Sequence, residues 1–458
     1  MTLSASFRRR VGGNARTASF FLWLAAALSV AGASATSEPS RVTPDQIVRD
    51  ALAHSLALQV SEKEVRAAEA RKAQTDSLTK PTLDIEARAW RYEGLEAVSL
   101  GGLLTIPAIE SRYAASATLA QPIYTGGRIT SERENAEHLR RAAGYRRRAT
   151  EADVVLQALT AYWGWSKAYY SVSALQAAVD RVAAHAADMR NLREAGMATD
   201  NDTLATDVLL DQTRLRLEEA RRRVKLTRAQ LVFLTGRELA DAAAPEEAPP
   251  ARDTASTPET DAAQAVARRP ERQALEMQWK ASKAQIVSSR ADLYPQIFLT
   301  ARYEQDRPNS LFFPPEDQWQ DDAFAGLSLG WQVFDWGRTR ASVLEAAQRA
   351  DQARLRLQQA EEQIALEVTQ ARIDLEDAGE RLPVAARTED SARRNLEVAT
   401  DLWKHGLTRH SDVLDAYSQL SDAQYSVTAA RADVRLAQAS LDHALGREPA
   451  GAPSPEKR

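Results

Sequence analysis

The sequence QPIYTGGR, residues 121–128, returns in altered form as WQVFDWGR, residues 331–338. The two copies are 210 positions apart, and other landmarks keep the same spacing. Three pairs of glycines are each separated by 210 positions: Gly127 and Gly337, Gly196 and Gly406, and Gly236 and Gly446. Echoes that stay in register over this length predict a tandem duplication of a unit of slightly over 200 residues.

Each copy of the motif follows residues that alternate between apolar and polar side chains. Leu83 and Ile85, for example, alternate with Asp84 and Glu86. This period of two predicts β-strands at about residues 82–92 and 113–123 in the first repeat, and at about 296–304 and 323–334 in the second. Strands with one apolar face are typical of a transmembrane barrel, but a half-buried sheet in a soluble protein gives the same pattern.

The repeated motif itself lies where the strand period ends and a helical period begins. Glycine permits the sharp change of backbone direction that such a junction needs. We therefore predict a strand-to-helix turn in each repeat, formed by Gln121, Pro122, Gly126, Gly127 and Arg128 in the first and by Gly337 and Arg338 in the second.

Long helices are predicted to follow these turns. In the second repeat Ile364, Val368, Ala371 and Leu375 recur at steps of four and three residues, the spacing of a coiled coil. The long helices are predicted at 129–193 and 337–405, the tips at 195–203 and 406–411, and the return helices at 204–235 and 412–445. Pro383 is expected to interrupt and kink the second long helix.

The remaining segments complete the predicted domain organisation. The first repeat covers 36–236 with an opening helix at about 44–78, the second covers 261–446 with an opening helix at about 261–290, a linker occupies 237–260, and a disordered tail occupies 447–458. Residues 1–35 contain four arginines, an apolar run and the sequence Ala33-Ser34-Ala35. That pattern predicts a cleaved secretory signal peptide, with a retained N-terminal anchor as the alternative.

The composition excludes several classes of protein and site. The chain has 458 residues and no cysteine, which excludes disulfides and thiolate catalysis. Its net charge is −4, and −8 without the four arginines of the first 35 residues, whereas nucleic-acid-binding domains usually carry a basic surplus. No phosphate-binding loop, zinc-protease motif or nucleophile elbow occurs. We therefore predict a protein that is not an enzyme, needs no cofactor or metal, and binds no nucleic acid.

The number of strands limits what one chain can form in a membrane. Single-chain membrane barrels begin at eight strands, so four strands per chain would have to be shared among several copies. Two copies would give eight strands and three would give twelve. Each chain would send its long helices away from the bilayer in one direction, because strands and helices are joined by tight turns.

At this point the sequence resembles a known family, the TolC-type outer-membrane efflux and secretion channels. The resemblance covers about residues 43–446. It depends on the duplicated glycine-arginine turns, on an aspartate six residues after both Gly196 and Gly406, and on the matching ends at Gly236 and Gly446.

The resemblance implies a mainly α-helical fold with transmembrane β-strands. A homotrimer would form a 12-strand β-barrel in the lipid of the outer membrane, continued by a periplasmic α-helical barrel. The implied function is a passive exit duct of a tripartite efflux or type I secretion system, with a periplasmic adaptor (membrane fusion protein) and an inner-membrane pump as partners. The alternative is a soluble periplasmic coiled-coil adaptor or scaffold, which leaves the strands without a role.

Acidic residues near the tips are the main candidates for a functional site. Asp412 and Asp415 are three positions apart and share one helix face, and rings of acids in a pore select cations. The stretch Ser411–Ala416 is similar to the constriction segment V-D-V-L-D-A of the family, and Asp202 resembles its acidic partner in closure of the tip. Aspartate near a helix start is equally typical of a cap, so both interpretations stand.

The resemblance also implies that the adaptor contacts the tip turns. The residues concerned are Gly196, Gly406, Trp403 and Leu407, with a plain helix turn as the alternative interpretation. Trp403 occupies a position where a tyrosine commonly ties the closed tip, and it cannot offer the same hydroxyl bond. His405 and His410 are expected to be exposed tip residues rather than a metal site or a pH sensor.

Overall fold

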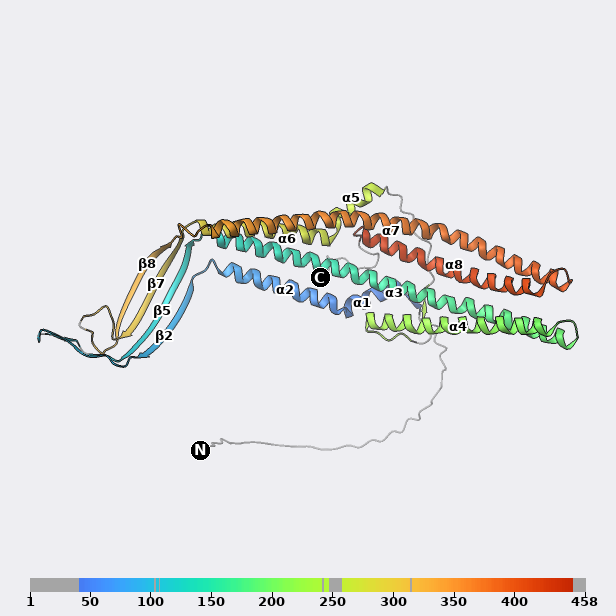
Figure 1. The fold of residues 1–458 in the computed structure, drawn as a ribbon, viewed down its shortest axis with the longest axis horizontal. Coiled ribbons are helices and arrows are strands. Elements are labelled where there is room, and N and C mark those ends of the chain that lie inside the picture. The colour runs from blue at the N-terminus through green and yellow to red at the C-terminus, as the bar shows by residue number, and fades with distance from the viewer. Residues whose placement is uncertain are drawn as a thin grey trace, which may run out of the picture. The chain divides into compact units, whose positions relative to one another are not determined.

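The computed structural model describes residues 41–102, 104–106, 108–240, 243–246, 258–313 and 315–447, which Figure 1 shows in colour. These residues belong to one unit, Ser40–Arg458. The predicted signal peptide, residues 448–458 of the predicted tail and much of the predicted linker lie outside the described ranges. Within the described part of the chain, no helix combines the length and the apolar character that a membrane-spanning helix requires.

The strands of the two repeats form one antiparallel sheet. The strands are β2 (Thr82–Arg91), β5 (Ser111–Tyr124), β7 (Gln296–Arg307) and β8 (Gln320–Gly330), in that order across the sheet. The central pair joins the repeats, with Ala117 of β5 opposite Tyr303 of β7. In the same row Ile85 of β2 faces Ala117, and Ala323 of β8 faces Tyr303. The apolar positions of all four strands therefore share one face of the sheet.

This apolar face is exposed in the single chain. Ile85 is 81% exposed and Leu327 is 72% exposed. The strands β2 and β8 lie at the two edges of the sheet, so each has only one neighbouring strand among the described residues. A short hairpin, β3 (Val98–Leu100) and β4 (Leu104–Ile106), extends from the loop after β2. One chain thus leaves both an apolar face and two backbone edges uncovered.

The ends of two strands differ from the prediction, and strand pairing explains why. β8 ends at Gly330, so residues 331–334 of the predicted strand 323–334 are not part of it. Gly330 pairs with Gln296, the first residue of β7, and the preceding Pro295 has no N–H with which to continue the ladder. β5, in contrast, extends to Tyr124 through an irregularity after Pro122, because β7 still lies beside it there.

Two helical hairpins continue from the sheet (Figure 1). In the first, α3 (Arg128–Glu194) returns as α4 (Asp200–Thr235), and in the second, α7 (Arg338–Lys404) returns as α8 (His410–Ala444). The helices α3 and α7 both have 67 residues, a length of about 100 Å. α3 packs against α4, α7 packs against α8, and α3 also packs against α8. The four helices therefore lie side by side in the order α4, α3, α8, α7.

Shorter elements support the half of the hairpins nearer the sheet. They are β1 (Arg41–Val42), α1 (Pro44–His54), α2 (Leu56–Ser77), β6 (Ala244–Pro245), α5 (Pro258–Arg268), α6 (Pro270–Arg290) and the 3₁₀ turn η1 (Ala291–Leu293). The helices α1 and α2 pack against α3, and α6 packs against both α3 and α7. The two-residue strands β1 and β6 pair in parallel. The predicted linker 237–260 therefore contains β6 and the first turn of α5.

Caps shift several helix boundaries from their predicted positions. Each opening helix is divided in two. Ser55 begins α2 by accepting a hydrogen bond from the Leu58 N–H at 3.2 Å. Pro270 begins α6, at a position where its missing N–H leaves no helical bond unmade.

The return helices also start earlier than predicted. They begin at Asp200 and His410 rather than at residues 204 and 412, because Thr199 and Arg409 occupy the N-cap positions. The tips therefore cover residues 195–199 and 405–409.

Pro383 does not interrupt α7, in contrast to the prediction. Proline removes one backbone hydrogen bond, the bond to the carbonyl four residues earlier. That residue is Gly379, and both it and Pro383 are exposed. Water can therefore hydrate the freed carbonyl, so the helix continues at a modest cost.

The largest buried side chains gather where α1, α3 and α4 meet β1 and β6. Tyr162 is fully buried and Trp165 is 1% exposed. The Tyr162 hydroxyl donates to the Val42 carbonyl at 2.9 Å and accepts from the Glu246 N–H at 2.9 Å. The aromatic residues of α3 thus pack in the core, and one of them ties the strand pair β1–β6 to the first hairpin.

Candidate functional site at the helix tips

Both hairpins turn by the same backbone device. Gly196 and Gly406 have φ angles of 73° and 71°, in the left-handed region that favours glycine. The next residue in each turn, Met197 or Leu407, donates its N–H to a carbonyl five residues earlier, at 2.8 Å and 2.9 Å. These are the bonds of a glycine-terminated helix, which satisfy carbonyls left open at the end of α3 and α7. Met197 and Leu407 are exposed at the two tips, at 71% and 73%.

The predicted acids Asp202 and Asp412 occupy equivalent positions after these turns. The Asp202 carboxylate accepts from the Thr199 N–H at 3.1 Å, and Thr199 Oγ1 accepts from the Asp202 N–H at 3.1 Å. The Asp412 carboxylate accepts from the Arg409 N–H at 3.3 Å and from the Thr408 hydroxyl. Both aspartates therefore act as helix caps, the alternative that the sequence left open.

Hydrogen bonds keep these two carboxylates charged. The hydrogen bond from the Thr199 side chain holds the pKa of Asp202 below its usual range, and the Thr408 side chain does the same for the pKa of Asp412. Asp412 and Asp415 are both exposed and lie about one helical turn apart. Capping does not remove these negative charges from the tip surface, so capping and a role in conduction are compatible.

A buried group of side chains, the tip cluster, lies directly behind the turns. It consists of His185 from α3, Thr206 from α4, Trp403 from α7, and His410 and Tyr417 from α8. The imidazole rings of His185 and His410 stack with their centroids 5.2 Å apart. The Trp403 ring lies 5.8 Å from the His185 ring and 5.3 Å from the His410 ring. All four long helices therefore contribute to one packed group.

The burial of His410 corrects the expectation of an exposed tip histidine. His410 is only 7% exposed, because α8 begins at this residue and directs it toward Thr206 of α4. His405 is exposed, as predicted, and its Nδ1 lies 2.9 Å from the Asp401 carbonyl oxygen. Trp403 packs inward in the tip cluster and is only partly exposed, whereas Leu407 is 73% exposed at the second tip.

His185 was not among the residues predicted to form the site, although its spacing along the sequence indicates that it is buried. His185 lies three residues after Val182 and four before Met189, and both of these are buried. That spacing places it on the apolar stripe of α3. Burial, with a smaller contribution from the neighbouring His410, lowers the pKa of His185 to about 4. Burial also lowers the pKa of His410, against an opposing effect of Asp202.

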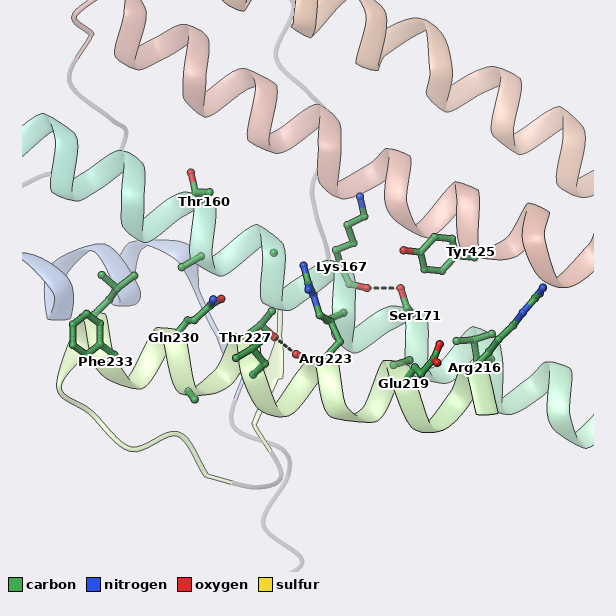
Figure 2. Close-up of a pocket in the computed structure, with 18 of the residues that line it drawn as sticks. Thr160, Lys167, Ser171, Arg216, Glu219, Arg223, Thr227, Gln230, Phe233 and Tyr425 are labelled. Atoms are coloured by element: carbon green, nitrogen blue, oxygen red, sulfur yellow. Dashed lines mark hydrogen bonds between the residues drawn. The ribbon is translucent and has the colours of Figure 1, made fainter. Parts of the chain in front are cut away.

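A groove lies between α4 and α8 beside α3, on the sheet side of the tip cluster and next to the aromatic core, the buried side chains around Trp165 (Figure 2). It has a volume of about 1270 Å³ and is lined by α3, α4 and α8. Figure 2 shows Lys167 pointing toward α8, where its Nζ lies 2.9 Å from an Asp433 carboxylate oxygen. Nearer the tip, Arg216 of α4 is 2.9 Å from Asp422 of α8. Long charged side chains thus bridge the hairpins along the groove, whereas the tip cluster joins them by close packing.

Comparison with known proteins agrees with this architecture. A family model described as outer membrane efflux protein matches residues 47–237 and 262–447. The chain belongs to the outer membrane efflux protein family. The two matched segments correspond to the two repeats, and the match confirms the resemblance inferred from the duplicated turns. Because this is a family of channels, the prediction that the chain is not an enzyme is also confirmed.

Individual relatives resemble this efflux protein in sequence or in fold. The multidrug resistance outer membrane protein MdtQ of Escherichia coli O157:H7 is 24% identical over 384 residues, which cover 81% of this chain and 78% of MdtQ. The outer membrane protein VceC of Vibrio cholerae has a TM-score of 0.75 at 18% identity, covering 88% of this chain and 96% of VceC. The open state of the Neisseria gonorrhoeae MtrE outer membrane channel has a TM-score of 0.70 at 19% identity, covering 88% of this chain and 89% of MtrE. The predicted fold class is therefore confirmed.

The predicted turn residues of the efflux protein divide between the end of a strand and the start of a helix. Gln121 and Pro122 lie inside β5 rather than in the turn, because the pairing with β7 extends past them. Gly126 and Gly127 have φ angles of 62° and 84° and lead into α3. A Cβ atom on Gly126 would lie 2.7 Å from the Ala291 carbonyl oxygen, so this position admits only glycine.

The arginines and the second glycine of the motif also have distinct roles. Arg128 forms an ion pair with Asp292, which links the first repeat to the short turn before β7. Gly337, with a φ of 84°, precedes α7. Asp335 caps that helix by accepting from the Thr339 N–H at 2.8 Å. Arg338 donates to the Gln332 side chain at 2.9 Å, so it holds the chain segment after β8.

One further group of possible metal ligands lies where α3, α6 and α8 of the efflux protein come together. Oxygen or nitrogen atoms of Asp153, Glu271 and His443 all lie within 4.8 Å of one another. His443 Nε2 is 3.0 Å from an Asp153 oxygen, and both Glu271 oxygens accept from Arg269, at 3.2 Å and 3.1 Å. Because these side chains already bond to one another and to Arg269, the arrangement is that of a hydrogen-bond network rather than a built metal centre.

Proposed function

We propose that this efflux protein is a passive exit duct in the outer membrane, built by three copies of the chain. The observation that carries the proposal is the single sheet with an exposed apolar face and two open edges. In lipid, an open edge leaves backbone groups without hydrogen-bond partners, so only a closed barrel is stable there. Pairing of β8 in one copy with β2 in the next would satisfy both edges.

The choice of three copies follows from the space that a duct requires. Two copies would supply eight strands, and a barrel of that size has an interior just wide enough to be filled by side chains. Three copies would supply twelve strands and leave a wider lumen. The apolar face would then contact the lipid of the outer membrane, and the helices would extend into the periplasm.

The outer helices of each chain support the same assembly. In the row α4, α3, α8, α7, the two end helices carry exposed apolar side chains. They include Leu204, Val208, Leu215 and Leu226 on α4, and Leu344, Leu355, Leu366, Ile373 and Val398 on α7. Packing α7 of one copy against α4 of the next would bury these side chains and close the row into a cylinder.

The tips would form the periplasmic entrance. Asp412 and Asp415, repeated by threefold symmetry, would place two rings of carboxylates at the constriction, with Asp202 beside them. The exposed turns at Gly196 and Gly406, with Leu407, would offer the contact surface for a periplasmic adaptor that links the duct to an inner-membrane pump. Opening would be a rearrangement of the hairpins, and the relative crystallised as an open channel supports the existence of such a state in the family. A soluble scaffold would leave the apolar face of the sheet unexplained.

Native mass spectrometry of the protein released from nanodiscs tests the stoichiometry. The expected assembly contains three chains. Leu366→Glu, which places a charge on the exposed face of α7 (60% exposed), is expected to shift the population toward single chains. Met197→Glu, at a tip position that is 71% exposed, serves as the matched control and should retain three chains. Wild-type protein that is folded but consists of one or two chains would contradict the proposal.

A further inference from the structure

The tip cluster contains two histidines that neither the capping bonds nor the proposed constriction uses. His185 is 6% exposed and His410 is 7% exposed. They belong to different hairpins, and their stacked rings lie in the contact between α3 and α8. Trp403 and Tyr417 cover the rings from the second hairpin. The contact thus closes around two imidazoles that are largely shielded from water.

The hydrogen bonds of Thr206 determine which ring nitrogen of His410 carries the proton. The Thr206 hydroxyl donates to the Asp202 carbonyl oxygen at 2.8 Å, so its oxygen is left to accept from His410 Nε2, which is also 2.8 Å away. His410 therefore carries its proton on Nε2 and has a bare Nδ1. That Nδ1 atom and His185 Nε2 are both buried without a hydrogen-bond partner in the described part of the chain. A proton added at His410 Nδ1 would create a buried N–H without an acceptor.

The charged groups around the cluster do not compensate for a proton on either ring. The negative charge of Asp188 on α3 favours the protonated form of His185, and that of Asp202 on α4 favours the protonated form of His410. Asp188 is exposed, and the Asp202 carboxylate is already bonded to Thr199 at the cap. Burial outweighs both carboxylates, so the pKa of each histidine is lowered.

Among the described residues, the other charged and titratable groups around the cluster do not stabilise a protonated ring either. Tyr417 on α8 has a raised pKa because of burial and therefore stays neutral. Arg181 on α3 is positive and acts on Tyr417. From α7 the cluster receives Trp403, which does not titrate, and the charges of Glu389 and Arg393 act on Arg181.

We propose that His185 and His410 form an acid-sensitive clasp between the two helical hairpins. Neutral imidazoles pack the tips together near neutral pH, and protonation of either ring favours separation of α3 from α8, where the ring can reach water. The groove behind the cluster lies between α4 and α8, so release of the clasp frees the tip ends of the hairpins, whereas α3 and α8 stay joined nearer the sheet by contacts such as the Lys167–Asp433 ion pair. The further consequence, that acidification of the periplasm favours an open entrance, rests on the proposed channel function.

The direction and size of the effect follow from the shift in proton affinity. A histidine with a pKa of about 4 when packed, and 6.5 when released, stabilises packing fully above pH 6.5. That stabilisation falls as the pH drops from 6.5 and is lost by about pH 4. At pH 5.5 the ratio of packed to released tips is expected to fall about tenfold through His185 alone. His410 shifts the balance in the same direction.

Hydrogen exchange followed by mass spectrometry on the full protein in nanodiscs tests the clasp directly. Exchange is compared at pH 7.5 and 5.5 after correction for the intrinsic effect of pH on amide exchange. Peptides covering residues 182–206 and 403–417 are expected to lose about tenfold or more of their protection at pH 5.5. Peptides from the aromatic core around Trp165 serve as the internal reference and should keep theirs. Equal corrected protection of the wild-type tip peptides at both pH values would overturn the proposal, whatever any variant does.

Two variants connect the response to the histidines. His185→Phe combined with His410→Phe keeps aromatic packing and removes both titrating groups, so the pH response of the tip peptides should disappear. His405→Phe, at an exposed histidine of the same tip, is the matched control and should respond as the wild type does. A double variant that keeps the full response would also overturn the proposal. Conductance measured in parallel separates the two claims: a pH response without conductance contradicts the channel alone, and conductance without a pH response contradicts the clasp alone.

Discussion

Neutralising both tip aspartates, by Asp412→Asn combined with Asp415→Asn, is expected to reduce the preference of the channel for cations over anions by about tenfold. A charge a few ångströms from a permeating ion in water changes its energy by about 1 kcal/mol, and 1.4 kcal/mol corresponds to a factor of ten. Three copies would place six such charges at the entrance. Asparagine retains a side-chain oxygen, so the Asp412 cap on the Arg409 N–H can persist in the variant.

Reversal potentials across a potassium chloride gradient measure this preference. Asp351→Asn, at an exposed acid of α7 near the sheet and far from the tips, is the matched control and should leave the selectivity unchanged. Because the Thr408 bond lowers the pKa of Asp412, this carboxylate should stay charged in the wild type when the pH falls from 7 to 5. Selectivity that is the same in the double variant and the wild type would remove Asp412 and Asp415 from the constriction.

Trp165→Ala is expected to lower the free energy of unfolding by about 3–5 kcal/mol, the usual cost of emptying a large aromatic site in a core. Trp165 is 1% exposed and packs against Tyr162, with their rings 6.0 Å apart. Tyr162 in turn bonds to Val42 and Glu246. The cavity would therefore weaken both the helix contact and the attachment of the strand pair β1–β6.

Urea unfolding followed by far-ultraviolet circular dichroism measures this loss. Trp336→Ala is the control, because Trp336 is 90% exposed in the single chain and its removal leaves no cavity. The control should change the free energy of unfolding by no more than about 0.5 kcal/mol. Equal destabilisation by the two substitutions would show that the aromatic core around Trp165 is not the main source of stability.

Much of the fold could be predicted because the same sequence patterns occur in both repeats. The 210-residue spacing fixed the two repeats, and the alternation around Ile85 and Tyr303 correctly predicted which residues share a face of the sheet. The exact ends could not be predicted, because they depend on partners distant in sequence. β8 stops at Gly330 only because its partner β7 starts at Gln296.

Less of the candidate site could be predicted from the sequence. The turns and acids at the tips carry local signals, and the capping role of Asp202 and Asp412 could be named in advance. The burial of His410 depends on α8 starting at that residue and on Thr206 lying across from it, a contact between residues 204 positions apart. His185 carried only a helical spacing, which indicates burial but does not identify a partner histidine.

Three features of one chain together support the channel account. The open sheet edges require neighbouring strands, the exposed apolar faces of α4 and α7 require neighbouring helices, and the acidic tips supply charge where the helices end. A closed arrangement of copies satisfies the first two at once. The third would give the proposed duct a constriction at which solutes can be discriminated.

Single-channel recording of the wild-type protein in planar bilayers shows whether three chains form a conducting pore. We expect discrete current steps, a small conductance when the tips are closed, and a preference for cations over anions. Protein that is folded, inserted in the bilayer and assembled from three chains, yet carries no current at any voltage applied, would contradict the proposal.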